Sequence, residues 1–132
     1  MNFPSKILIV DDEPHVRAFV TKLAEANLGA PTLFEAPDAE TALATFSREQ
    51  PDLVLLDTHL IGTSGLDLLE QLRALNEGVV IIMLSTVSAM SAIQEAVERG
   101  ANGYVLKHVG SDKVAKSLVE AVTDSFGGEN PA

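Results

Sequence analysis

The chain has 132 residues, of which 46% are hydrophobic and 21% charged, and its formal net charge at pH 7 is −10. This length fits one domain of ordinary size, and the balance is typical of a soluble globular protein and excludes a disordered or collagen-like chain. The acidity argues against direct binding to nucleic acid or anionic lipid, and the absence of cysteine excludes disulfides and thiol-based metal sites.

No apolar run approaches the roughly 20 residues of a membrane helix. Residues 1–6 also lack the basic and apolar regions of a signal peptide. We therefore expect a cytoplasmic protein without membrane association, whose partners are proteins with basic patches.

In chain order, the first strand is predicted at residues 6–10, followed by a weaker edge strand at 31–35. Three more apolar runs predict strands at 52–56, 79–84 and 104–106. The strong runs do not alternate between polar and apolar residues, which indicates strands covered on both faces, as in a parallel sheet flanked by helices.

The segments after these strands have apolar residues at helical spacing, so each predicts an amphipathic helix. The apolar positions are Val16, Phe19, Val20 and Leu23; Ala39, Ala42, Leu43 and Phe46; Leu68, Leu69, Leu72 and Leu75; Met90, Ile93 and Val97; and Val114, Leu118, Ala121 and Val122. Residues that suit helix starts are Pro14, Pro37, Ser64 with Asp67, and Ser111, whereas Gly78 and Gly100 suit helix ends.

Five strands alternating with five helices predict an α/β fold with a doubly wound, flavodoxin-like (βα)5 parallel sheet in the order 2-1-3-4-5. Residues 1–126 are predicted to form this single domain. Residues 127–132 are predicted to be a flexible tail, either a natural end or the start of a linker.

Ligands of open α/β sheets bind beyond the carboxyl ends of the strands. The residues found there are Asp11 and Asp12, Asp57, Ser85 and Lys107. Each alone has an ordinary explanation as a cap, turn or surface residue, but three converging carboxylates repel one another unless a cation relieves the charge. Oxygen ligands in a wet site favour Mg²⁺.

Beside such a cation, Asp57 is the candidate nucleophile for a phosphoryl group. Lys107 can offset charge on the phosphoryl oxygens, and Ser85 can donate a hydrogen bond to one of them.

Together these residues resemble the receiver domains of two-component response regulators, over residues 5–124. The motifs that carry the resemblance are VDDEP at 10–14, DLVLLD at 52–57, GTSG at 62–65, MLST at 83–86 and GANGYVLK at 100–107.

The resemblance implies a signalling phosphoacceptor rather than an enzyme. This phosphoacceptor would take a phosphoryl group from a phosphohistidine of a sensor histidine kinase or phosphotransfer protein. It implies that Asp12 binds Mg²⁺ directly, that Asp11 acts mainly through water, that Asp57 is the third acidic ligand, and that the backbone carbonyl of His59 completes the set.

The resemblance also implies a switch, in which Ser85 moves towards phosphorylated Asp57 and Tyr104 turns inward. This would alter the face formed by the fourth helix, fifth strand and fifth helix, where a downstream protein or a second copy of the chain would dock. The alternative is that Tyr104 is a fixed, half-buried aromatic residue.

Two positions depart from the family pattern, because Ile61 and His108 stand where proline is common. A cis peptide costs about 2.5–4 kcal/mol when no proline follows, so we expect a trans Lys107–His108 bond. We also expect the long side chain of Lys107 to reach Asp57.

Three enzyme or cofactor-binding classes fit poorly. A flavin binder needs a phosphate loop where this chain has acids at 11–13, a haloacid-dehalogenase-type phosphatase needs an acid at His59, and no P-loop motif is present. The remaining alternative is a receiver-like binding module that signals without phosphorylation.

Overall fold

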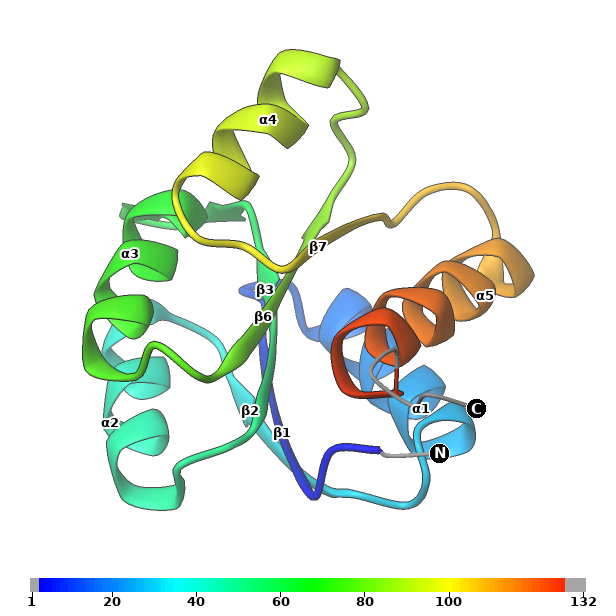
Figure 1. Ribbon diagram of the computed structural model, residues 1–132, viewed down its shortest axis with the longest axis horizontal. Helices are drawn as coiled ribbons and strands as arrows, with labels where there is room; N and C mark the ends of the chain where they lie inside the picture. Colours follow the sequence, from blue (N-terminus) through cyan, green and yellow to red (C-terminus); the bar gives the residue numbers. More distant parts are fainter. Residues whose placement is uncertain (1–2, 128–132) are drawn as a thin grey trace.

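A computed structural model describes residues 3–127 of the chain (Figure 1). Five parallel strands form one sheet in the order β2-β1-β3-β6-β7. They are β1 (Lys6–Val10), β2 (Thr32–Ala36), β3 (Leu53–Asp57), β6 (Val80–Ser85) and β7 (Gly103–Leu106). If only the strands of this sheet are numbered in chain order, β6 and β7 are its fourth and fifth strands. The observed order is then the predicted order 2-1-3-4-5, and the predicted fold is confirmed.

A small ribbon, which the sequence pattern does not predict, interrupts the connection after β3. Its strands β4 (His59–Leu60) and β5 (Thr63–Ser64) are antiparallel and are joined by Ile61 and Gly62. Gly62 has a φ of +83°, a backbone conformation that glycine adopts without steric cost. The ribbon therefore turns tightly at the end of the sheet that carries the candidate site.

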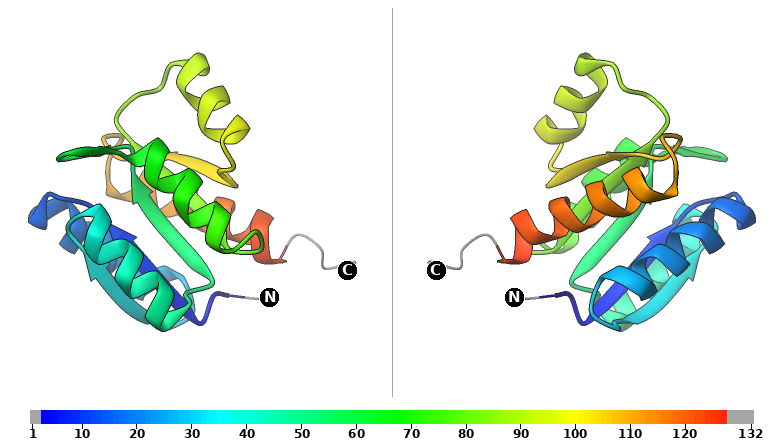
Figure 2. Two further views of the ribbon diagram at one scale, coloured as in Figure 1. Left: turned by 90° about the vertical axis from the view of Figure 1, so that its left-hand side faces the viewer. Right: turned by 90° about the vertical axis from the view of Figure 1, so that its right-hand side faces the viewer.

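Helices cover both faces of the sheet, as the two side views show (Figure 2). The helices are α1 (Pro14–Asn27), α2 (Ala39–Glu49), α3 (Gly65–Leu75), α4 (Met90–Glu98) and α5 (Ser111–Val122), and a π-helical turn (Thr123–Gly127) follows α5. Helices α2, α3 and α4 contribute to the core on one face, and α1 and α5 to the core on the other.

Successive residues of each strand supply the two halves of the core in turn. In β1, Leu8 and Val10 face one half while Ile7 and Ile9 face the other, and all four are completely buried. Removing both faces of a strand from water requires apolar residues at consecutive positions, which explains why these runs do not alternate.

Several predicted helix boundaries are confirmed. Helix α1 begins at Pro14, and the Ser64 side chain caps α3 by accepting a hydrogen bond from the Leu66 amide. The reciprocal half of the predicted capping box is not seen, because the Asp67 carboxylate contacts Arg99 instead. Gly100 follows the end of α4 with a φ of +115°, which a residue with a side chain adopts only with strain.

Three other boundary predictions are wrong. Pro37 precedes α2, whose cap is Asp38 because its carboxylate can accept an amide hydrogen bond. Ser111 is the first residue of α5 rather than its cap, and Gly110 occupies the cap position with a φ of +98°. Gly78 lies beyond the end of α3.

Four predicted strands are displaced by one residue at one or both ends, so that Asp57 and Ser85 are the last residues of β3 and β6 rather than the residues after them. Gly127 belongs to the π-helical turn, and the rest of the predicted tail lies outside the described residues. Within residues 3–127, no helix is long and apolar enough to cross a membrane.

Candidate functional site

The parallel register brings the carboxyl ends of the central strands to one level. It pairs Val10 with Leu56, Asp57 with Leu84, and Ser85 with Leu106. The backbone then continues this alignment, because the Lys107 amide donates to the Ser85 carbonyl at 2.9 Å. Asp11, Asp57, Ser85 and Lys107 therefore emerge at neighbouring strand ends.

Asp57 lies at the centre of this row and is only 3% exposed. Its Oδ1 accepts a hydrogen bond from the Lys107 ammonium at 3.1 Å and one from the His59 amide at 3.2 Å. Lys107 Nζ also lies 3.3 Å from Asp11 Oδ2. Lys107 thus reaches Asp57 directly, as expected, and the Lys107–His108 peptide is trans.

The charges of the site shift the pKa values of two of its members. Burial raises the pKa of Asp11 above its ordinary value, and the charge of Asp57 raises it further, against the lowering effects of the Glu13 amide and Lys107. Burial alone would lower the pKa of Lys107, but the charges of Asp57 and Asp11 outweigh it and raise the pKa. Lys107 therefore stays protonated, while ionised Asp11 is destabilised without further positive charge.

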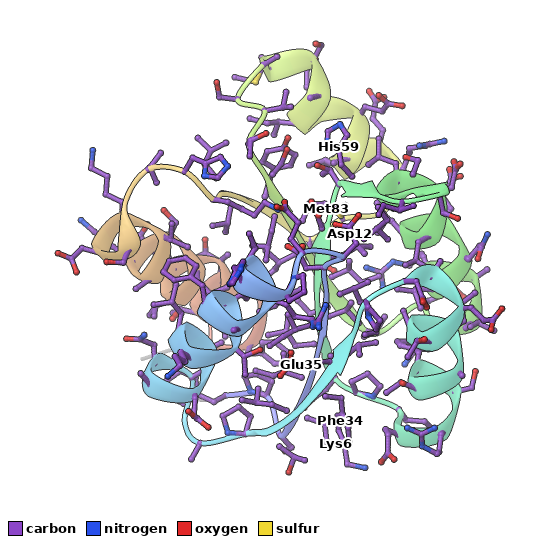
Figure 3. The ribbon with its side chains drawn as sticks, turned by 180° about the vertical axis from the view of Figure 1, so that it is seen from behind. Lys6, Asp12, Phe34, Glu35, His59 and Met83 are labelled. Carbon is purple, nitrogen blue, oxygen red and sulfur yellow. The ribbon has the colours of Figure 1, made fainter. Side chains whose placement is uncertain are left out.

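Asp11, Asp12 and Asp57 form the acidic cluster that the sequence predicts. Each offers one carboxylate oxygen, and these oxygens all lie within 4.8 Å of one another. Figure 3 shows Asp12 and His59 at the same end of the sheet, far from Lys6 at its opposite end. Three close carboxylate oxygens are a donor set that a hard divalent cation prefers.

Contacts to the loops hold two of these acids. Arg17, on α1, donates from Nη1 to the backbone carbonyl of Asp11 at 2.7 Å, and the Glu13 amide donates to Asp11 Oδ1 at 2.9 Å. Asp12 Oδ2 accepts from the Ile61 amide at 3.0 Å, which ties the acid to the β4–β5 ribbon. Proline has no amide hydrogen, so this bond depends on the departure from the family pattern at Ile61.

Ser85 and Tyr104 belong to a hydrogen-bonded network beside the acids. Ser85 is completely buried, and its Oγ accepts from the Thr58 hydroxyl and from the Val87 amide, both at 3.0 Å. The half-buried Tyr104 donates its hydroxyl to the Val87 carbonyl at 2.7 Å. The two predicted switch residues are therefore connected through Val87.

Two hollows adjoin the network. One lies beside Asp57 and is lined by Glu13, Asp57, His59, Thr86, Val87 and Lys107. The other lies between the β4–β5 ribbon and α4 and is lined by Thr58, His59, Leu60, Ser64, Leu66, Ser85, Val87, Ala92 and Tyr104. The first hollow gives a small anionic group access to Asp57 and to the Lys107 ammonium.

Four contributors to the site were not predicted from the sequence, namely Arg17, Thr58, the Ile61 amide and Gly65. Gly65 is buried, its amide donates to the Thr58 carbonyl at 3.0 Å, and an added Cβ would meet the Asp57 carbonyl oxygen. The role of Gly65 could have been predicted, because it ends the GTSG motif at residues 62–65. The other three act through contacts that no local pattern marks.

Comparison with known proteins identifies relatives over most of the chain. Residues 7–119 match the family model of the response regulator receiver domain. The nitrate/nitrite response regulator protein NarP of Escherichia coli is 36% identical over 119 residues, which are 90% of this chain and 54% of NarP. Sporulation initiation phosphotransferase F of Bacillus subtilis is 31% identical over 86% of this chain and 90% of its own length.

Solved structures agree with these relatives. A two-component response regulator of the LuxR family from Aurantimonas superposes with a TM-score of 0.82 at 26% identity, over 92% of this chain and 86% of that one. A CheY-like receiver domain protein from Methanospirillum hungatei gives a TM-score of 0.78 at 25% identity, over 92% and 95% of the two chains. The chain spans about half the length of several curated relatives, including NarP and NarL.

Proposed function

The chain belongs to the response regulator receiver domain family, and we propose that it accepts a phosphoryl group on Asp57 in a Mg²⁺-dependent reaction. The observation that carries this proposal is the buried carboxylate of Asp57, which lies 3.1 Å from the Lys107 ammonium and beside two further acids. Receiver domains are signalling phosphoacceptors and are generally not classed as enzymes.

The donor set fits Mg²⁺. Asp11, Asp12 and Asp57 would hold the ion, with Asp12 as a direct ligand, Asp11 acting mainly through water and the His59 carbonyl completing the protein's share. All of these groups offer oxygen, the atom that Mg²⁺ prefers. When bound, Mg²⁺ would neutralise part of the charge of the acids and of the phosphoryl oxygens.

The proposed step is an in-line transfer to the Asp57 carboxylate. One carboxylate oxygen forms a bond to phosphorus while the bond between phosphorus and the donor's imidazole nitrogen breaks, and its electron pair stays on that nitrogen. Lys107 offsets charge on the phosphoryl oxygens, and Ser85 donates a hydrogen bond to one of them. Asp57 itself is 3% exposed, so little water competes for its own bond with the Lys107 ammonium.

The phosphoryl donor would be a phosphohistidine of a sensor histidine kinase or a histidine phosphotransfer protein. Membership of the family supports this donor, and a two-component response regulator is among the similar structures. The proposed setting is the cytoplasm. We propose no direct contact with nucleic acid, in line with the net charge of −10.

The output would be a change in the face formed by α4, β7 and α5. A hollow on this face is lined by Ile93, Tyr104, Val105, Leu106, Val109, Lys113, Lys116, Ser117 and Glu120. Movement of Ser85 towards a phosphoryl group would disturb Val87, which accepts the Tyr104 hydroxyl, and so would reach this face. A downstream protein or a second copy of the chain would bind there.

The test is incubation with a small phosphodonor, with and without Mg²⁺, followed by intact mass measurement. The wild type should gain one phosphoryl group only with Mg²⁺, Asp57→Asn should gain none, and Asp112→Asn, which changes an exposed acid on α5, should behave like the wild type. Phosphorylation of Asp57→Asn would refute the assignment. No gain by the folded wild type would favour a binding module that signals without phosphorylation.

A further inference from the structure

The Ser85 hydroxyl, which the proposed mechanism needs at the phosphoryl group, is bound elsewhere in the structure. Its Oγ accepts from the Thr58 hydroxyl and the Val87 amide, each at 3.0 Å. Among the described residues, the hydrogen bonds of the Asp57 carboxylate come from His59 and Lys107, not from Ser85. Both bonds use Ser85 Oγ as the acceptor, so its own hydrogen stays available, and what separates it from Asp57 is its position: Ser85 lines the hollow between the β4–β5 ribbon and α4 and not the hollow beside Asp57. The Ser85 side chain must therefore turn, and leave Thr58, before it can donate to a group on Asp57.

Thr58 is well placed to hold Ser85, because its own backbone is fixed at both ends. Its amide donates to the Leu84 carbonyl at 3.1 Å, which continues the pairing of β3 with β6, and its carbonyl accepts from Gly65 at 3.0 Å. His59 Nδ1 lies 3.1 Å from Thr58 Oγ1 on the more exposed side. The two backbone bonds of Thr58 therefore fix its position next to β6, and its hydroxyl contacts Ser85 from this fixed position.

We propose that Thr58 is a positioning residue that holds the Ser85 hydroxyl away from Asp57 until a phosphoryl group is bound. This inference rests on the proposed function and adds a control on it. Binding of a phosphoryl group replaces the bond between Thr58 and Ser85 with a bond from Ser85 to a phosphoryl oxygen. The energy of the first bond is lost in that exchange, so Thr58 lowers the affinity for the bound group.

Tyr104 is connected to this exchange through Val87 and can report it optically. Tyr104 is the only tyrosine of the chain, which has no tryptophan. Its hydroxyl binds the carbonyl of Val87, whose amide binds Ser85. Release of Ser85 from Thr58 should therefore change the fluorescence of Tyr104 even without a ligand.

The experiment measures binding of beryllofluoride, a mimic of the phosphoryl group, by calorimetry at saturating Mg²⁺ and one pH. Thr58→Val keeps the shape of the side chain but lacks the hydroxyl, and it should bind about two- to tenfold more tightly than the wild type. Thr58→Ser, which keeps a hydroxyl, should resemble the wild type. In a Ser85→Ala background, Thr58→Val should change nothing, because the partner hydroxyl is absent.

Affinity for Mg²⁺ alone separates positioning from a general structural effect, and it should be equal in the wild type and in Thr58→Val. If Thr58→Val does not fold, Thr58→Ala removes the same hydroxyl. Absence of beryllofluoride binding by the wild type would overturn the proposed function together with this inference. Binding by the wild type with no gain in Thr58→Val, a gain that persists without Ser85, or a changed Mg²⁺ affinity would overturn the inference alone.

Discussion

Replacing Gly65 with alanine should destabilise the fold and damage the site together. Gly65 begins α3 directly beneath the acceptor loop, and an added Cβ would meet the carbonyl oxygen of Asp57 and lie 2.7 Å from Thr58 Cα. Both neighbours are backbone, so neither can rotate away. Overpacking of this kind costs about 1–3 kcal/mol. The greater helix propensity of alanine returns at most about 1 kcal/mol in a helix interior and less at the first position.

Urea unfolding followed by circular dichroism gives the free energy of unfolding. The matched control is Gly78→Ala, whose Cβ would have Asn76 Oδ1 as its nearest neighbour at 3.4 Å, an ordinary contact. After the offset from helix propensity, Gly65→Ala should lose about 0.5–3 kcal/mol relative to this control and should bind Mg²⁺ more weakly, because Asp57 is displaced. Equal unfolding free energies for the two variants would refute the steric argument.

Three further predictions follow from other contacts. Burial raises the pKa of Asp11, so ionising this carboxyl lowers the free energy of unfolding at pH values above the ordinary aspartate pKa. Asp11→Asn should therefore raise the urea midpoint of the metal-free protein at pH 7. A gain in midpoint that did not shrink on acidification would contradict this prediction. Ile61→Pro removes the amide that binds Asp12, so calorimetry should show Mg²⁺ binding about two- to tenfold tighter, not unchanged or weaker. Arg73→Met leaves the Gly100 carbonyl without its donor, because this carbonyl accepts from Arg73 at 2.7 Å and 3.2 Å. The variant should lose about 1–3 kcal/mol of unfolding free energy in urea, while its Mg²⁺ affinity stays the same. A stability equal to the wild type would show that water replaces the guanidinium.

The predicted positions of the main site residues depended only on where strands end. Asp11 and Asp57 follow or finish apolar runs, and parallel strands place such ends at the same edge of a sheet. Their proximity could therefore be predicted without coordinates. Displacements of one residue, as at the end of β3, did not matter, because the side chain still lies at that edge.

Local composition was less informative where two residues competed for one role. Pro37 and Asp38 both suit a helix start. Asp38 caps α2 because its carboxylate accepts a hydrogen bond from a helix amide, whereas the proline side chain has no acceptor atom. Similarly, Ser111 was a reasonable cap by type, but the backbone before α5 has a positive φ that Gly110 provides. Capping depends on backbone angles, which the residue type alone does not determine.

By itself, the sequence determined the order of strands and helices, the doubly wound sheet and the row of Asp11, Asp57, Ser85 and Lys107, because burial patterns and strand ends are local properties. Only the tertiary structure decided which hydroxyl holds Ser85. Thr58 and Ser85 are 27 positions apart and meet because β3 lies beside β6 in one particular register. A hydrogen bond requires its two atoms to lie within a few tenths of an ångström of about 3 Å, and only the packed sheet specifies positions so closely.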